Sequence, residues 1–207
     1  MDSAIVSVLT ISGVIALGAM SPGPSFILVA RTAMSSSLKN SLAVAFGMGT
    51  GCAFFAFVAL LGLQSLLLTV PWLYMSLKVG GGLYLIYLAF KMFFAPKRTL
   101  KFESEAVAQR SLSRSFYIGL MTQISNPNTA LVFGGIFAAI LTQNIAGWMY
   151  IVLPGLAFLI DLIWYAIVAC LLSAPVPRNY YMRFKIYFDR LGGVVMGLLG
   201  LKLIFQK

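Results

Sequence analysis

The chain has 207 residues, of which 60% are hydrophobic and only 10% are charged, and its mean hydropathy is +0.95. Because about 25% of the residues in an ordinary soluble domain are charged, this composition excludes a water-soluble protein and predicts an all-α membrane protein. The net charge of +10 does not indicate a nucleic-acid partner, since the basic residues lie between apolar runs, where they would face anionic lipid headgroups.

Six apolar runs are long enough to cross the bilayer, because a spanning helix needs about 20 mostly apolar residues. In chain order they cover residues 4–34, 41–67, 73–95, 114–142, 148–173 and 187–206. The longest polar stretch, residues 96–113, separates a first half (1–95) from a second half (114–207) with three runs each. The sequence therefore predicts a single transmembrane domain over residues 1–207, built from six transmembrane helices.

The first run contains a segment that should interrupt its helix, Ser21-Pro22-Gly23-Pro24. Proline lacks a backbone donor, and its ring clashes with the preceding helical turn. Proline is nevertheless favoured in the first turn of a helix, and serine caps helix starts. A second helical piece capped by Ser21 is therefore expected to begin at Pro22 or Pro24, so that the first transmembrane helix is broken at SPGP.

The fourth run has a similar segment, Ser125-Asn126-Pro127-Asn128, in which Asn126 can cap a helix that resumes at Pro127. Two halves of three crossings each are inverted relative to each other, and matched interruptions in inverted halves indicate a transporter binding site. Each resumed helix would present unpaired amides and a positive dipole end, which suit a carboxylate. The alternative is a pair of ordinary proline kinks.

A weak internal similarity favours two inverted three-helix repeats. Residues 81–91 (GGLYLIYLAFK) and 192–202 (GGVVMGLLGLK) share a glycine pair and a lysine at the same spacing, although chance matches of this kind are common. Twelve of the 15 basic residues lie in the first, third and fifth connections or at the ends of the runs beside them. Since positive residues stay inside, those connections are expected in the cytoplasm and both termini outside.

Asp161 is the only acidic residue deep within an apolar run. A carboxylate at the bilayer centre costs at least ~2.5 kcal/mol, so such a residue normally faces the bundle interior and carries function. Burial disfavours its charged form, which would let Asp161 bind and release a proton. The alternative is an acid that fixes helix packing. Trp164 and Tyr165 follow on the same helix face and could shape a pocket, although aromatic residues in such helices more often serve packing.

Small residues in the apolar runs have simpler interpretations. Gly47, Gly49 and Gly51 are predicted to allow close contact between helices. Cys52 and Cys170 have no metal-binding or redox spacing, and we interpret both as small buried residues.

Three motifs together resemble the LysE/RhtB family of bacterial amino-acid exporters: PGP in the first run, GxxYLxYLxxK in the third and NP in the fourth. The likeness covers essentially the whole chain. It implies a secondary transporter, without a cofactor or enzymatic activity, that exports an amino acid or close derivative across the bacterial inner membrane, driven by the proton gradient. Tyr84, the first tyrosine of the third-run motif, joins the candidate site.

The resemblance departs from the family pattern at two positions. The fourth-helix motif of the family is usually NPK, whereas Asn128 follows Pro127 here and removes a cation from the membrane. Many members also have an acid in the second helix near Cys52, and this chain has none there. Both differences bear on the substrate and the coupling ion.

Three other classes of protein remain open: a metal-ion or cation permease of the same superfamily, an intramembrane enzyme and a structural membrane subunit. The sequence has no histidine and two isolated cysteines, which leaves few ligands for a divalent ion and no nucleophile–base pair. A structural subunit would leave the matched interruptions and Asp161 unexplained.

The sequence thus yields one candidate proton-coupling residue, Asp161, and ten candidate substrate-binding residues. The ten are Ser21, Pro22, Gly23, Pro24, Tyr84, Asn126, Pro127, Asn128, Trp164 and Tyr165. The expected partners are an amino acid, protons and the lipid bilayer, and the glycine-rich faces permit a homodimer.

Overall fold

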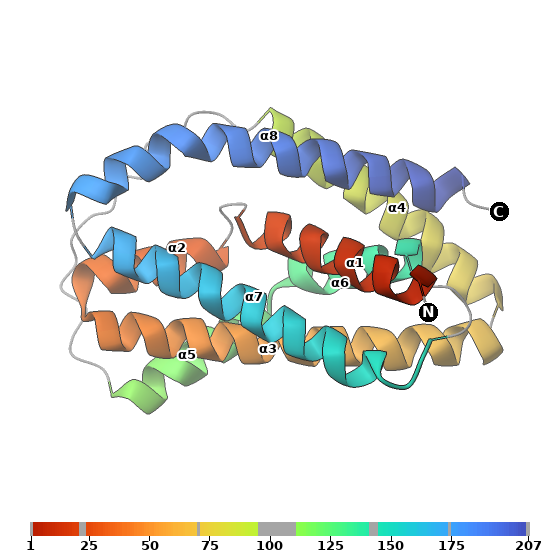
Figure 1. The fold of residues 1–207 in the computed structure, drawn as a ribbon, viewed down its shortest axis with the longest axis horizontal. Coiled ribbons are helices and arrows are strands. Elements are labelled where there is room, and N and C mark those ends of the chain that lie inside the picture. Colours follow the sequence, from red (N-terminus) through yellow and green to blue (C-terminus); the bar gives the residue numbers. More distant parts are fainter. Residues whose placement is uncertain are drawn as a thin grey trace.

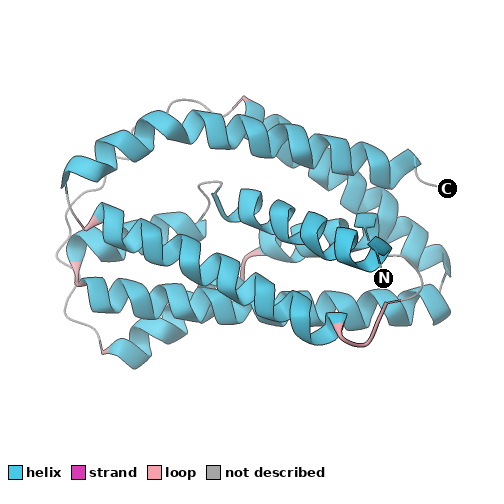
Figure 2. Ribbon diagram, viewed as in Figure 1, coloured by secondary structure: helices cyan, strands magenta, loops and turns pink. Residues whose placement is uncertain are grey.

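The computed structural model describes residues 2–20, 24–69, 71–94, 111–140, 145–173 and 175–205, and these residues include eight α-helices (Figure 2). The helices are α1 (Asp2–Met20), α2 (Pro24–Ser35), α3 (Leu38–Thr69), α4 (Pro71–Phe93), α5 (Leu112–Ile124), α6 (Pro127–Ile140), α7 (Met149–Leu172) and α8 (Pro175–Phe205). The predicted all-α class is confirmed for this part of the chain.

In the part of the chain that the structure describes, two helices are long and apolar enough to cross a membrane by themselves: α3, over Leu38–Gly62, and α7. They confirm the helices predicted from the apolar runs 41–67 and 148–173. Helices α1 and α2 qualify together as one bent span, with an angle of 53° between them. Within the described residues, α4 and α6 contain shorter apolar segments, Val79–Phe93 and Asn128–Ala138.

The last helix is longer than the apolar run that predicted it. The run covers residues 187–206, whereas α8 begins at Pro175. An apolar run marks where a helix can face lipid, but a helix continues into water until the sequence stops it. Prolines are tolerated in the first turn, and residues 178–191 contain neither proline nor glycine, so nothing in this polar segment ends the helix.

Two pairs of short helices follow one another directly. Helix α1 ends at Met20 and α2 begins at Pro24, with residues 21–23 outside the described part of the chain. Helix α5 ends at Ile124 and α6 begins at Pro127. Both second members begin at a proline, whose fixed φ angle suits the first helical position.

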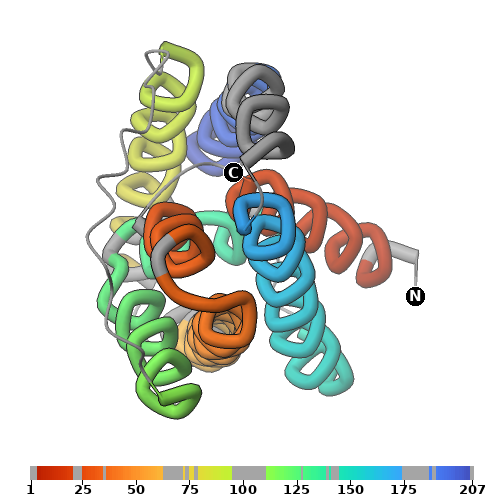
Figure 3. Tube along the Cα trace, turned by 90° about the vertical axis from the view of Figure 1, so that its left-hand side faces the viewer, coloured from red at the N-terminus to blue at the C-terminus, as the bar shows by residue number. Residues whose placement is uncertain are grey.

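Helices from the two halves of the chain interleave. Helix α3 packs on α5 and α7, α4 packs on α8, and both α1 and α2 contact α7. In the view along the bundle, α4 and α8 lie side by side at one edge while α3 and α5 lie at the other (Figure 3). The start of α1 and the end of α8 lie at the same end of the bundle (Figure 1). Each helix of the first half therefore contacts the second half.

The interior consists of two apolar cores. The larger core collects side chains of α1, α3, α4, α6, α7 and α8, among them Phe137. The smaller core packs α2 against the beginning of α3 and the end of α7, with Phe26 at 0% exposure. Along α7 the larger core extends to Ile160 and the smaller begins at Leu162. Asp161 lies at the junction of the two cores.

The glycines of α3 allow close helix contact, as the sequence predicts. A Cβ atom added to Gly47 would collide with the carbonyl oxygen of Phe116 in α5. One added to Gly49 would lie 2.9 Å from the carbonyl oxygen of Phe158 in α7, and one added to Gly51 would again meet α5. Helix α3 thus holds α5 and α7 at backbone contact distance.

Replacing Gly47 with alanine should lower the thermal unfolding midpoint of the protein in detergent micelles. The added methyl group has no room against Phe116, and overpacking of this kind costs ~1–3 kcal/mol. Gly62→Ala, on the same helix, is the matched control because a Cβ there meets no atom within 4 Å. Equal midpoints for the two variants would contradict the close contact between α3 and α5.

Candidate functional site

A buried carboxylate lies in the middle of α7. Asp161 is 3% exposed, and its Oδ2 accepts a hydrogen bond of 3.1 Å from Nε2 of Gln123 in α5. Oε1 of Gln123 in turn accepts a hydrogen bond of 2.8 Å from Oγ of Ser25 in α2. These three side chains form the Ser25–Gln123–Asp161 chain, which links α2, α5 and α7.

Two members of the Ser25–Gln123–Asp161 chain lie at helix ends. Ser25 is the second residue of α2, and Gln123 lies in the last turn of α5. An unsatisfied buried polar group costs ~1–3 kcal/mol, and the penalty rises in a hydrocarbon environment. The interruptions between α1 and α2 and between α5 and α6 therefore place Ser25 and Gln123 at the level of Asp161, whose carboxylate needs hydrogen-bond partners.

The thiol of Cys52 in α3 completes the group. It lies beside the Asp161 carboxyl and the Gln123 amide and lines the same cavity, and the residue is 1% exposed. The prediction that Cys52 is buried is confirmed. The same prediction is wrong for Cys170, which is exposed, because its neighbour Ala169 occupies the buried face of α7.

Asn126 caps α6, as the sequence predicts. Its side-chain Oδ1 accepts a hydrogen bond of 3.1 Å from the backbone N–H of Asn128, and its carbonyl oxygen accepts bonds from the N–H groups of Thr129 and Ala130. Pro127 has no N–H group. The expectation of unpaired amides at the start of α6 is therefore wrong, although the positive end of the helix dipole remains there.

A second side-chain bond joins the two halves of the chain at this level. The hydroxyl group of Tyr84 in α4 donates a hydrogen bond to Oδ1 of Asn128 in α6. Because Asn128 also donates its backbone N–H to Asn126, the first turn of α6 is held to α4.

A cavity of about 130 Å³ lies among these side chains. Pockets for drug-sized ligands measure about 300–1,000 Å³, so this cavity suits a smaller molecule. Apolar side chains of α1, α4, α6 and α8 complete its wall. Its lining residues with a polar side-chain atom or a thiol are Ser25, Cys52, Gln123, Asn126, Asn128, Thr129, Asp161 and Tyr165.

The structure brings four of the predicted site residues together at this cavity: Asn126, Asn128, Asp161 and Tyr165. Tyr84 reaches the same place through its bond to Asn128. The site therefore combines residues from α4, α6 and α7, as well as the connection between α5 and α6.

The other predicted residues have different positions. Trp164 packs against the smaller apolar core and is not among the lining residues of the cavity. Pro24 and Pro127 are the first residues of α2 and α6. The remaining three, Ser21, Pro22 and Gly23, lie outside the described residues.

The sequence analysis did not include three residues in the site: Ser25, Gln123 and Cys52. Gln123 carried a usable signal, because it is an amide within an apolar run, four residues before Pro127. Ser25 follows the SPGP segment directly but resembles any other serine near a helix start. Nothing in the sequence around Cys52 indicates that it faces Asp161.

The profile of the LysE type translocator family matches residues 16–207 of the chain. The chain belongs to this family. The resemblance drawn from the three sequence motifs is confirmed, and the chain is a membrane-embedded transporter rather than an enzyme.

The similar proteins are matched over almost their whole length. A threonine efflux protein of Salmonella typhi is 32% identical over 200 residues, which cover 96% of this chain and 97% of that protein. A threonine efflux protein of Escherichia coli K12 is 31% identical over 201 residues, which cover 96% and 98%. An uncharacterized membrane protein of Haemophilus influenzae is 28% identical over 193 residues, which cover 91% of each chain. No solved structure matches the chain.

A double-mutant cycle should show that Ser25 and Gln123 are energetically coupled. Removing either partner leaves the other without its buried hydrogen bond, so Ser25→Ala, Gln123→Met and the double variant should give non-additive losses of stability, with a coupling energy of ~0.5–1.5 kcal/mol. The cycle is measured by thermal unfolding in detergent. Ser25→Ala combined with Tyr84→Phe is the control pair and should be additive; additivity in both cycles would show that the bond contributes nothing.

Proposed function

We propose that the chain exports a small polar amino acid, such as threonine or a close derivative, from the cytoplasm in exchange for protons. The observation that carries this proposal is the buried carboxylate of Asp161, which lines a small cavity beside the junction of α5 and α6. The relatives named as threonine efflux proteins support the substrate class.

The proposed topology has six crossings in two inverted repeats. Helices α1 with α2 and α5 with α6 each form one crossing that is broken near the bilayer midplane, while α3, α4, α7 and α8 each cross once. An even number of crossings agrees with the start of α1 and the end of α8 lying at one end of the bundle (Figure 1). Helix α3 packs on its counterpart α7, and α4 on its counterpart α8, an arrangement that a pseudo-two-fold axis between the halves would allow.

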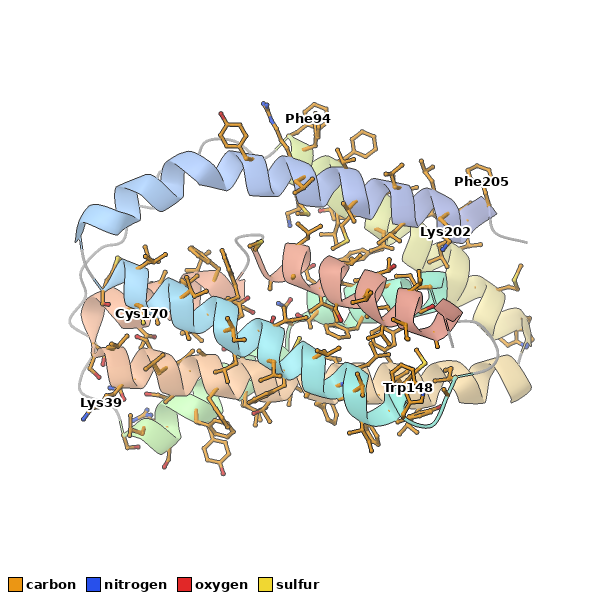
Figure 4. All side chains as sticks on the ribbon, viewed as in Figure 1. Lys39, Phe94, Trp148, Cys170, Lys202 and Phe205 are labelled. Carbon is orange, nitrogen blue, oxygen red and sulfur yellow. The ribbon has the colours of Figure 1, made fainter. Side chains whose placement is uncertain are left out.

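The proposed orientation places both termini outside, in the bacterial inner membrane. Lys39 lies at one end of the bundle, whereas Trp148 and Lys202 lie toward the other (Figure 4). The start of α5 and the end of α7 lie at the same end of the bundle as Lys39 (Figure 1). In the sequence, most of the basic residues belong to the first, third and fifth connections. Positive residues remain in the cytoplasm, and tryptophan is common at membrane interfaces.

The polar groups around the cavity match the groups of an amino acid. The carboxylate of Asp161 suits the ammonium group of the substrate, and the positive end of the α6 dipole suits its carboxylate. The amide of Gln123 can bond to a side-chain hydroxyl group, because an amide both donates and accepts hydrogen bonds. A small cavity with a few convergent polar groups is the usual form of a metabolite site.

One carboxylate can hold a proton or an ammonium group, but not both at once. A protonated Asp161 has no charge to pair with the substrate, and a substrate ammonium displaces the proton. Proton and substrate therefore occupy Asp161 in alternation, which is the condition for exchange. The proton gradient then drives the substrate outward as protons move inward.

Counterflow into liposomes that contain the purified protein tests the function directly. Liposomes preloaded with unlabelled threonine should accumulate labelled threonine and, more weakly, labelled serine and homoserine. Labelled glutamate should not accumulate, because its second carboxylate would face Asp161. Uptake of Mn²⁺ without uptake of any amino acid would instead identify a cation permease and overturn the proposal.

Asp161→Asn should abolish transport driven by a pH gradient. Exchange of threonine should stay measurable but require a higher threonine concentration, because the variant lacks the carboxylate that pairs with the substrate ammonium. Asparagine keeps the shape of the side chain but cannot carry the proton. The measurement compares uphill transport and counterflow in the same liposomes. Cys170→Ser, on the exposed face of α7, is the control and should retain both activities. Undiminished uphill transport by Asp161→Asn would contradict the proposed coupling to protons.

A further inference from the structure

The cavity beside Asp161 has an apolar side as well as a polar one. Helices α4 and α8, which lie across the bundle from α5 (Figure 3), contribute Leu88, Met92 and Met196 to its lining. Both methionines are buried, with Met92 6% exposed and Met196 1% exposed. The cavity therefore has a methionine wall, formed by Met92 and Met196.

The end of each methionine side chain lies against a glycine of a neighbouring helix. A Cβ atom added to Gly192 of α8 would collide with Cε of Met92 in α4. One added to Gly18 of α1 would lie 3.5 Å from Cε of Met196 in α8. Gly192 and Met196 are four residues apart and share one face of α8. The two glycines thus leave the space that the terminal methyl groups of the methionine wall occupy, where α1, α4 and α8 meet.

The methionine wall differs from ordinary core packing. Both methionines belong to the larger apolar core, but a side chain that only packs the core would be surrounded by protein, whereas these two border the cavity. Methionine is unbranched and polarizable, so it adapts to irregular shapes. Because the cavity measures only about 130 Å³, the position of this wall decides how large a ligand fits beside the polar groups.

The polar groups of the cavity leave one part of threonine without a partner. Under the proposed function, Asp161 pairs with the ammonium group, the start of α6 faces the carboxylate, and Gln123 bonds to the hydroxyl group. The remaining group is the γ-methyl, which is apolar and needs an apolar surface. Since α4 and α8 lie across the bundle from α5, which carries Gln123 (Figure 3), the methionine wall offers that surface on the side away from the hydroxyl.

We propose that the methionine wall holds the γ-methyl group of the substrate and sets the largest β-substituent that the site accepts, an inference that rests on the exporter function proposed above. Met92 and Met196 are then residues that determine specificity. The hydrogen atom that serine has in place of the γ-methyl leaves part of the cavity empty, whereas an ethyl or isopropyl group collides with the methionines. A difference of one methylene group in an apolar pocket changes selectivity by about tenfold or more.

Competition against labelled threonine in the liposome counterflow assay measures this size limit. The unlabelled competitors are serine, threonine, 3-hydroxynorvaline and 3-hydroxyleucine, which share the amino-acid group and the β-hydroxyl group. They differ only in the β-substituent, which is hydrogen, methyl, ethyl or isopropyl. For the wild-type protein we expect threonine to compete best and 3-hydroxynorvaline to need at least about a tenfold higher concentration for half inhibition.

Two variants that change the wall in opposite directions should shift this preference in opposite directions. Met196→Ala enlarges the cavity and should improve competition by 3-hydroxynorvaline, relative to threonine, by at least about tenfold. Gly18→Ala adds a methyl group to the lining beside Met196 and should favour serine over threonine by a similar factor. Met75→Ala is the matched control, because Met75 of α4 is 54% exposed and is not among the lining residues; it should keep the wild-type order.

The outcomes separate this proposal from the exporter function. Each variant is first checked by size-exclusion chromatography, since loss of a buried methionine also lowers stability. If Met196→Ala does not fold, Gly18→Ala decides the result, because it removes no packing. Unchanged ratios among the competitors in the folded variants would overturn the methionine wall while the exporter function stands. A wild-type protein that exchanges no amino acid would overturn both.

Discussion

The hydrogen bond between Gln123 and Asp161 is the constraint around which the rest of the structure is arranged. It joins a carboxylate that lipid cannot solvate to an amide at the end of α5. Two apolar cores close the bundle on either side of this level, so the polar groups between them must satisfy one another. Continuous helices would fill that level with paired backbone, whereas the end of α5 and the start of α2 bring Gln123 and Ser25 to the carboxylate.

The same level carries the polar links between the two halves of the chain. Ser25 of the first half bonds to Gln123 of the second, and Tyr84 of the first bonds to Asn128 of the second. Elsewhere the halves meet through glycine contacts between backbones, such as the contact between α3 and α5 at Gly47. Close-packed contacts of that kind leave few voids and tolerate little change in geometry. Any rocking of one half against the other would therefore have to change the contact between α3 and α5 as well as the hydrogen bonds at the cavity.

Much of the helical framework follows from the sequence, because apolar runs and proline interruptions are local signals. The helix over residues 148–173 and the capping role of Asn126 are examples. The pairing of Gln123 with Asp161 is not local, since it depends on how closely α5 approaches α7 over the glycines of α3. The prediction of unpaired amides at the start of α6 is wrong for a related reason. The residue that caps the helix, Asn126, already accepts hydrogen bonds from the first free N–H groups of α6.

The polar residue after Pro127, Asn128, lines the same cavity as the carboxylate of Asp161. A lysine there, as the family motif usually has, would place a fixed cation within the membrane, where Asn128 instead bonds to Tyr84. In the described part of the chain Asp161 contacts two neutral groups, the Gln123 amide and the Cys52 thiol. A buried charge without a counter-ion is strongly unfavourable, so the empty site needs water or a cation from outside. A proton or a substrate ammonium supplies that cation, and in either form the bundle can close over a neutral pair. Under the proposed mechanism the charged, empty form is then the one that resists closure, which ties each outward movement of substrate to an inward movement of a proton.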